Sequence, residues 1–396
     1  SPRTSSTLRR LSALSAAVML ALTISSCSTG KSDDDPVISS LNAQEADAAA
    51  PENYRSVKDN GPLSTASGTV IMSTSDKNGV NDTVTGDLTT TGVSRDPSTT
   101  RFQWAVSIKP AVADQERIQY AGSAQSAMSE NMDRSSTGSA VVSPDGRHLS
   151  LFLLPAEQQS GETAADQHTH IVVLDTKTGK TVRDATVSGI ILGQALTNSA
   201  LAVETAQNYF PAGSGKGTIR VFPITSSDAQ PSSFSTDQWL IGASGKDLLL
   251  VPDVPPYECT LDCTPYTVTR RGTDGHTIAT LPGVTAVHPG GWVSQYRDPK
   301  AATSLVHTMH ASPDNNDATE DARQKLRMLP KQLVHIDTGQ TTDTTDMTVD
   351  ERSVPNGLGL VIYQDVPTGN GSTERKPVFW LSAADDGHRH TENLEQ

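Results

Sequence analysis

The sequence contains few aromatic residues, few charged residues and little cysteine. Aromatic residues make up 4% and charged residues 19% of the 396 residues, and the chain has 3 cysteines. Patterns that would give long amphipathic helices are hard to find, whereas Thr, Ser, Val, Ala, Gly and Asp are abundant. This composition predicts many short strands joined by turns. The length allows one large all-β domain or two smaller ones.

Basic residues are also in deficit. The chain has 31 Lys and Arg against 45 Asp and Glu, which gives a formal net charge of −14. Nucleic-acid phosphates are bound by clusters of Lys and Arg, so we expect no nucleic-acid partner. The acidity fits a solvated extracellular surface.

Short sequence signatures of catalysis are missing as well. Neither G-x-S-x-G nor H-E-x-x-H occurs. Residues 213–218 are glycine-rich, but they lack the G-K-[ST] order of a phosphate-binding loop, which favours a hairpin loop. We therefore assign no catalytic, cofactor-binding or metal-binding residue and expect no cofactor, although catalytic residues could also come together from distant parts of the chain.

Histidine pairs are the remaining candidates for a metal site. His168 and His170 alternate on an expected strand, and His307 and His310 form a second pair. A zinc site needs three or four ligands, so we interpret these residues as solvated loop histidines unless the pairs converge. His388 and His390 are expected to be ordinary surface residues of the tail.

Residues 139–187 contain the pattern that the chain repeats. Four short apolar runs are separated by a polar insert and by tight turns at 144–146 and 177–179. Glycine accepts a positive φ without a steric clash, so Asp-Gly and Thr-Gly between β-branched runs indicate hairpins. This stretch therefore predicts a small antiparallel sheet of four strands.

Similar turns recur along the chain, near Asp145, Asn198, Gly245, Gly290 and Asn356. Their spacing of about 45–66 residues is close to that of propeller blades, with inserts in the longer intervals. Residues 143–149 (S-P-D-G-R-H-L) resemble TolB and YVTN-type repeats, and residues 173–180 resemble YVTN and quinoprotein-type repeats. The resemblance implies an all-β β-propeller of six, alternatively seven, four-stranded antiparallel blades, and it implies no particular function.

The last blade lacks an obvious fourth strand. The tail from His388 is polar and poorly suited to a strand, yet a closed ring has to hide its edges. Residues 69–73 could supply that strand instead, which would change the number of blades. Residues 316–328 carry acids in the first turn and bases in the last, which predicts a short helix.

The N-terminus combines Arg9 and Arg10 with an apolar run at 11–24, which is too short to span a bilayer comfortably. Residues 24–27 (I-S-S-C) then resemble the bacterial lipobox. That resemblance implies cleavage before Cys27, diacylglycerol on its thiol and an acyl chain such as palmitate on its amino group. The alternative is an ordinary secreted protein. The expected organisation is a signal peptide at 1–26, the lipidated Cys27 with a flexible, disordered linker at 27–52, and the propeller at 53–396.

Cys259 and Cys263 are the two remaining cysteines. Because an export signal implies an oxidising compartment, we expect them to form a disulfide that closes a small loop. A C-x3-C metal site is the alternative.

The connections between the second and third strands of the expected blades are long, whereas the turns between the first and second strands are short. Long inserts on one rim are where repeat proteins place binding surfaces. We expect a monomeric, non-catalytic binding or scaffold module, anchored by lipid on the extracytoplasmic side of the cell membrane, for a protein or cell-envelope partner. The alternatives are an envelope hydrolase or lyase with an axial pocket and a sensor partner of a membrane kinase or transporter. The expected inserts are 76–100, 155–169, 205–217, 252–265, 298–331 and 366–376.

Overall fold

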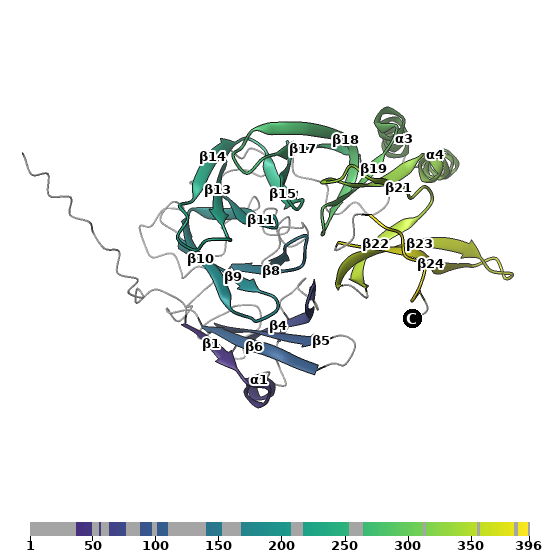
Figure 1. Ribbon diagram of the computed structural model, residues 1–396. Coiled ribbons are helices and arrows are strands. Elements are labelled where there is room, and N and C mark those ends of the chain that lie inside the picture. Colours follow the sequence, from purple (N-terminus) through teal and green to yellow (C-terminus); the bar gives the residue numbers. More distant parts are fainter. Residues whose placement is uncertain are drawn as a thin grey trace, which may run out of the picture. The chain divides into compact units, whose positions relative to one another are not determined.

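The computed structural model divides into two units, residues 1–33 and 34–396. The residues that it describes all lie in the second unit, which consists mostly of antiparallel strands (Figure 1). They are 37–49, 55–56, 63–76, 88–96, 101–109, 140–152, 168–206, 217–252, 264–311, 314–354, 357–383 and 387–394.

The first sheet has six strands, in the order β1-β6-β5-β4-β2, and β3 also pairs with β4. Helix α1 (Ala43–Ala49) contacts β1, β5 and β6. The strands are β1 (Val37–Leu41), β2 (Arg55–Ser56), β3 (Leu63–Thr65), β4 (Gly68–Asp76), β5 (Leu88–Asp96) and β6 (Arg101–Lys109).

The second and third sheets are four-stranded antiparallel meanders in chain order. The second contains β7 (Ala140–Val142), β8 (His148–Phe152), β9 (His168–Asp175) and β10 (Thr181–Ser188). The third contains β11 (Ile190–Leu196), β12 (Ala200–Ala206), β13 (Gly217–Pro223) and β14 (Ser232–Thr236).

The fourth sheet has seven strands because β18 is continuous where the sequence predicts two strands, 276–281 and 284–287. Helices α3 (Pro299–Ala311) and α4 (Asn316–Met328) lie between β19 and β20, and α4 coincides with the predicted helix. The strands are β15 (Trp239–Ala243), β16 (Leu248–Val251), β17 (Tyr266–Arg271), β18 (Thr277–His288), β19 (Trp292–Tyr296), β20 (Lys331–His335) and β21 (Thr341–Asp343).

The fifth sheet contains β22 (Thr348–Val354), β23 (Gly357–Pro367) and β24 (Thr373–Ser382). Its fourth-strand position is taken by a single bridge between Trp380 and His390. The alternative that residues 69–73 complete this sheet is wrong, because they belong to β4 and pair with β5 in the first sheet.

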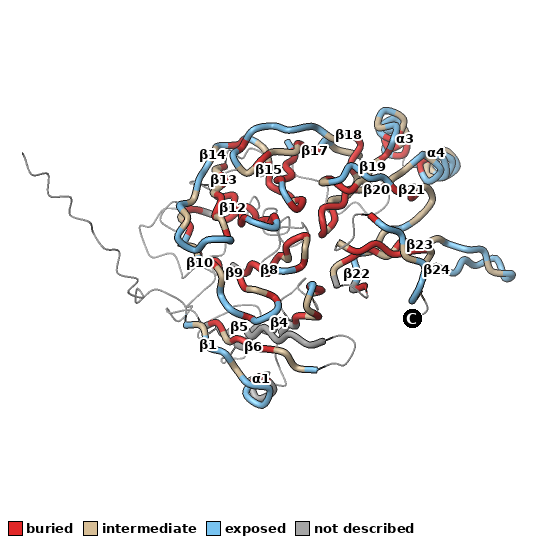
Figure 2. Tube along the Cα trace, in the orientation of Figure 1, coloured by how far each residue is buried: buried red, intermediate tan, exposed pale blue. Residues whose placement is uncertain are grey.

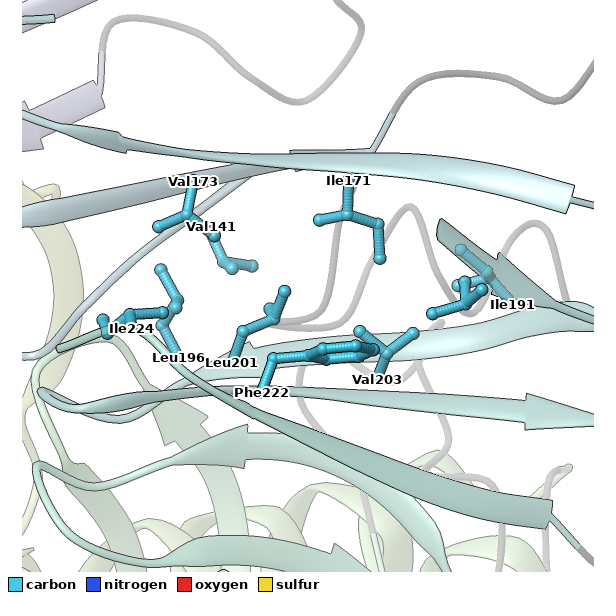
Figure 3. Packing of buried hydrophobic residues seen from close by; sticks show 10 residues of the cluster. Val141, Ile171, Val173, Ile191, Leu196, Leu201, Val203, Phe222 and Ile224 are labelled. Atoms are coloured by element: carbon cyan, nitrogen blue, oxygen red, sulfur yellow. The ribbon is translucent and has the colours of Figure 1, made fainter. Parts of the chain in front are cut away.

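Apolar clusters fill the spaces between successive sheets. Between the second and third sheets, Ile171 and Val173 of β9 meet Leu201 and Val203 of β12 and Phe222 of β13 (Figure 3). Similar clusters join the first sheet to the second and the third to the fourth, and Trp292 joins the fourth to the fifth. Most of the buried chain therefore lies in strands, while the outer surfaces of α1, α3 and α4 are exposed (Figure 2).

Part of the predicted flexible linker is folded, so the assignment of 27–52 to a disordered tether is wrong for residues 37–49. β1 pairs with β6 from Val37 opposite Lys109 to Leu41 opposite Ala105. Asn42 then caps α1: its Oδ1 accepts from the Glu45 N–H, and the Glu45 carboxylate accepts from the Asn42 N–H, both at 2.8 Å. This reciprocal capping box fixes where the helix begins.

Other sequence predictions also need correction. Residues 88–96 form β5 rather than part of a polar insert, and the strand β14 was missed. Both segments are rich in Ser and Thr, so their strand character comes from pairing with neighbours rather than from an apolar pattern. The four tryptophans of the chain all lie in strands and are buried; they are Trp104, Trp239, Trp292 and Trp380.

Candidate functional site

The sheets have two ends with different connections. The turns β3–β4, β7–β8, β11–β12 and β15–β16 are short, and we call the end of the sheets that carries them the turn end. The opposite end, which we call the loop end, carries the connection from β4 to β5, the two helices between β19 and β20, and the hairpin between β23 and β24.

Hydrogen bonds join neighbouring sheets at the turn end. The Ala66 N–H donates to the Gly146 carbonyl at 3.0 Å, and the Asp145 N–H donates to Asn198 Oδ1 at 2.9 Å. The Asn198 N–H then donates to the Gly245 carbonyl at 2.9 Å. These bonds connect the first sheet to the second, the second to the third and the third to the fourth, so these turns lie on one side.

Each of these turns is stabilised from within by a buried hydroxyl. Thr65, Ser143, Thr197 and Ser244 directly precede the turns and are fully buried. Their side-chain oxygens accept from N–H groups two to five residues later, with distances of 3.0–3.3 Å. Such hydroxyl-centred turns satisfy backbone donors that would otherwise be buried without a partner. The turn end is therefore held by the protein's own groups.

Asp337, in the β20–β21 turn, is the acceptor that completes this set of bonds. Its Oδ1 accepts from the Ser244 hydroxyl and its Oδ2 from the Gly245 N–H, both at 2.7 Å. We expect Asp337→Ala to lower the free energy of unfolding by about 1–3 kcal/mol, because both donors lose a charged acceptor. Chemical denaturation measures this loss. Asp184→Ala, which removes an exposed carboxylate from β10, serves as the control and should change stability by less than about 0.5 kcal/mol.

At the loop end, α3 and α4 form a helical hairpin with its own small core. Val306 and Met309 of α3 pack against Ala322 and Leu326 of α4, over Tyr296. The α4 N-terminus is capped by Asn315, whose Oδ1 accepts from the Ala318 N–H at 3.1 Å. The hairpin is therefore a packed unit that presents polar outer surfaces.

The second feature of the loop end is the arm, residues 364–376, formed by the ends of β23 and β24. Its tip is closed by the Thr368 N–H, which donates to the Ser372 carbonyl at 2.8 Å. At its base, the Arg375 guanidinium lies 4.4 Å from the Tyr363 ring centre and forms an ion pair with Asp350 at 2.8 Å. These contacts support the base of the exposed hairpin.

The loop end carries a charged cluster that we call the loop-end patch, comprising Arg327, Asp346 and Asp365. Arg327 Nε donates to Asp346 Oδ1 at 2.9 Å, and this hydrogen bond, together with the charges of Asp346 and Asp365, raises the pKa of Arg327. Met328 is 62% exposed and Val366 is 37% exposed. Large exposed apolar side chains beside ionic groups are typical of an interaction surface.

A buried acid, Glu204, lies between the third and fourth sheets. Its side chain is 2% exposed, and its Oε2 accepts from the Leu240 N–H of β15 at 2.7 Å. Burial raises the pKa of Glu204 to about 8, although the Leu240 N–H acts in the opposite direction. The carboxyl group is therefore mostly protonated at neutral pH.

The residues that the sequence assigned to modification lie outside the described part of the chain. Cys27, Cys259 and Cys263 all belong to segments for which nothing is described. The lipid anchor and the disulfide therefore stay predictions.

The histidine pairs do not come together as a metal site among the described residues. On β9, His168 and His170 each contact a hydroxyl of β10, Ser188 and Thr186, at 3.1 Å. His307 and His310 are exposed on α3. Within the described ranges, no group of three or more His, Cys, Asp or Glu side chains is placed to hold a metal ion.

The prediction for the tail histidines is wrong for His390. Its ring stacks on Trp380 with centroids 3.9 Å apart, and its backbone bridges to β24. The ring thus packs against the edge of the last sheet and is not an ordinary surface side chain.

Sequence reasoning also missed Glu204, Asp337 and the loop-end patch. A Ser or Thr precedes each of the short turns, and this repeated pattern is a sequence signal that could have pointed to the turn end, where Asp337 lies.

Comparisons with known proteins give distant structural likenesses only. No family model matches the chain, and no curated protein matches it. An acylaminoacyl peptidase in complex with Z-Gly-Gly-Phe-chloromethyl ketone aligns with 11% identity and a TM-score of 0.40, over 86% of this chain and 45% of the peptidase. This chain thus spans about half the length of that peptidase.

Two further solved structures are comparably distant. The β-propeller domain of the Trilobed protease from Pyrococcus furiosus has 8% identity and a TM-score of 0.34, over 63% of this chain and 69% of that domain. An uncharacterized protein from Listeria monocytogenes EGD-e has 8% identity and a TM-score of 0.38, over 85% of this chain and 82% of its own. Likenesses this weak carry no argument about activity.

Proposed function

We propose that the chain is a lipid-anchored, extracytoplasmic β-propeller of six blades that binds a protein or envelope partner through its loop end without catalysing a reaction. In this proposal β18 serves twice: its first half is the outer strand of one blade, and its second half, from Val284, is the inner strand of the next. The contact of β3 with β22 and β23 supports closure of the ring, because it brings the first sheet to the last.

The difference between the two ends is the observation that carries the binding proposal. Buried hydroxyls and Asp337 hold the turn end together internally, whereas the loop end carries the helical hairpin, the arm and the exposed side chains of Met328 and Val366. Rigid sheets that support long connections at one end are a common arrangement for binding surfaces. The lipid on Cys27 would hold that surface near a membrane.

A hydrolase or lyase is the second candidate, and Glu204 is the observation that favours it. A carboxyl group that keeps its proton at neutral pH can act as a general acid. Its 2% exposure and its bond to the Leu240 N–H instead favour a structural role in the packed interface between the sheets. Retention of all activity by Glu204→Gln in a screen of envelope glycans and peptides would remove this candidate.

The binding proposal predicts that substitutions at the loop end reduce recovery of the partner more than a substitution at the turn end does. We expect Met328→Asp combined with Val366→Asp to reduce partner recovery at least about tenfold, because two apolar contacts are lost and two charges are introduced. Ile278→Asp is the control, since Ile278 is 41% exposed at the start of β18, at the turn end. Quantitative mass spectrometry after co-purification from membranes measures recovery. Equal recovery from both variants would contradict a loop-end binding surface.

A further inference from the structure

We propose that Asn370, at the tip of the arm, is a modification site where the side-chain amide is hydrolysed spontaneously to a carboxylate. The products are aspartate and isoaspartate at position 370. The tip carries no charge of its own, since residues 367–373 read P-T-G-N-G-S-T, so the reaction introduces a negative charge there. This inference is independent of the proposed binding function, and it gives the arm a chemical change that needs no enzyme.

The reaction begins at the backbone nitrogen that follows the asparagine. Once hydroxide has taken its proton, the Gly371 nitrogen attacks Cγ of Asn370. The new N–C bond closes a succinimide ring, and the side-chain nitrogen takes a proton from water and leaves as ammonia. Water then opens the ring at either carbonyl, and nothing is oxidised or reduced. A Cβ on the following residue would crowd the attack, so a glycine at position 371 favours it.

The tip offers little obstruction to ring closure. Asn370 and the glycines on both sides of it are exposed, and a Cβ added to Gly369 or Gly371 would meet nothing within 4 Å beyond its chain neighbours (Figure 2). The Gly371 N–H donates to the Thr368 carbonyl at 3.3 Å. That bond is longer than the usual range of about 2.7–3.2 Å. The nitrogen that has to react is therefore only weakly held.

The bonds that close the arm lie outside the reacting pair. The backbone N–H and the hydroxyl of Thr368 both donate to the Ser372 carbonyl, at 2.8 and 2.9 Å, and the last ladder pair of β23 and β24 lies directly below them. Asn370 and Gly371 can rearrange while these bonds stay intact. The reaction therefore needs only a local movement of an exposed loop tip and no unfolding of the sheet.

Asn198 provides an internal contrast, because it is also exposed but is held by hydrogen bonds. Its Oδ1 accepts from the Asp145 N–H at 2.9 Å, and the N–H of Ser199, which would have to attack, donates to Thr197 Oγ1 at 3.2 Å. Both reacting groups are thus engaged at the turn end. The sequence has three further Asn-Gly pairs, whose asparagines lie outside the described ranges, at positions 60, 78 and 356.

Peptide mass spectrometry of the full-length protein tests the proposal, because it follows each asparagine separately. The protein is incubated at pH 7.5 or 8.5 and digested at acidic pH, and conversion is read from a mass gain of about 1 Da. We expect Asn370 to convert at least about tenfold faster than Asn198, and about tenfold faster at pH 8.5 than at pH 7.5, because hydroxide removes the proton. In a denaturant that unfolds the chain, the rate at Asn198 should rise, whereas the rate at Asn370 should change less than about threefold.

Two glycine substitutions at the tip form a matched pair. Gly371→Ala should slow the conversion of Asn370 at least about fivefold, because its methyl group crowds the attacking nitrogen. Gly369→Ala leaves that nitrogen as it is and should change the rate less than about twofold. An unchanged rate at Asn198 shows that each variant stays folded. Conversion of Asn370 no faster than that of Asn198, equal slowing by both substitutions, or an acceleration of Asn370 above about tenfold in denaturant would overturn the proposal.

Discussion

Glu204→Gln is expected to flatten the pH dependence of stability between pH 5 and 8. The pKa of Glu204 is about 8 in the folded protein, against 4.5 for the ordinary side chain. The unfolded chain therefore loses its proton first, and the stability that is fully present below pH 4.5 is lost as the pH rises through 8. At about 1.4 kcal/mol per pKa unit, the loss is on the order of 5 kcal/mol. Glutamine keeps the shape and can still accept from the Leu240 N–H, but it does not titrate.

Denaturant unfolding of both proteins at pH 4, 6, 7 and 9 measures this effect. We expect the two to be similarly stable at pH 4 and the variant to be increasingly the more stable one as the pH rises. Glu374→Gln, which removes a carboxylate that is 60% exposed, is the matched control and should leave the pH profile unchanged. Parallel profiles for the wild type and Glu204→Gln would show that the carboxyl group is not desolvated as the structure has it.

Trp292→Ala should destabilise the protein by about 3–5 kcal/mol, the usual cost of removing a large buried aromatic side chain. Trp292 is fully buried and packs with Leu333 of β20 and with Leu360 and Phe379 of the fifth sheet. It therefore joins the fourth and fifth sheets. Because the fifth sheet comprises three strands and one bridge within the described ranges, we expect the loss of protection to be greatest there.

Thermal unfolding gives the total effect of this substitution, and hydrogen exchange locates it. Amides of β22, β23 and β24 should exchange faster in the variant, whereas those of the second and third sheets should change little. Met328→Ala, at a position that is 62% exposed, is the control and should change stability by less than about 0.5 kcal/mol. A loss below 1 kcal/mol for Trp292→Ala would contradict the packing between these sheets.

The repeated turns show which parts of the structure can be predicted from the local sequence. Gly146 and Gly179 have φ values of +72° and +71°, in the turns that Asp-Gly and Thr-Gly predict. A Cβ on Gly179 would collide with the Trp104 ring, whose Nε1 donates to the Thr176 carbonyl at 2.9 Å. The local turn was predictable, but Trp104, which lies 72 positions before Thr176 in the chain and packs against this turn, was not.

The edges of sheets were predicted least well. Residues 37–41 were expected to be a tether and are a strand, because β6 offers them an unpaired edge. Residues 276–288 were divided into two strands, although one continuous strand pairs with β17 on one side and β19 on the other. An edge strand gains its hydrogen bonds from a distant partner, and short windows of sequence do not contain that partner.

The sequence by itself determined the all-β character, most inner strands, the tight turns and the α4 helix, because alternation, glycine in turns and helix charges act within a few residues of the chain. Only the tertiary structure decided that Glu204 is buried against Leu240, that Asp337 holds the Ser244 turn, and that Met328 and Val366 are exposed. Those outcomes depend on which strands become neighbours. Burial in the folded protein shifts the pKa of a carboxyl group by more than the residues next to it in the sequence do.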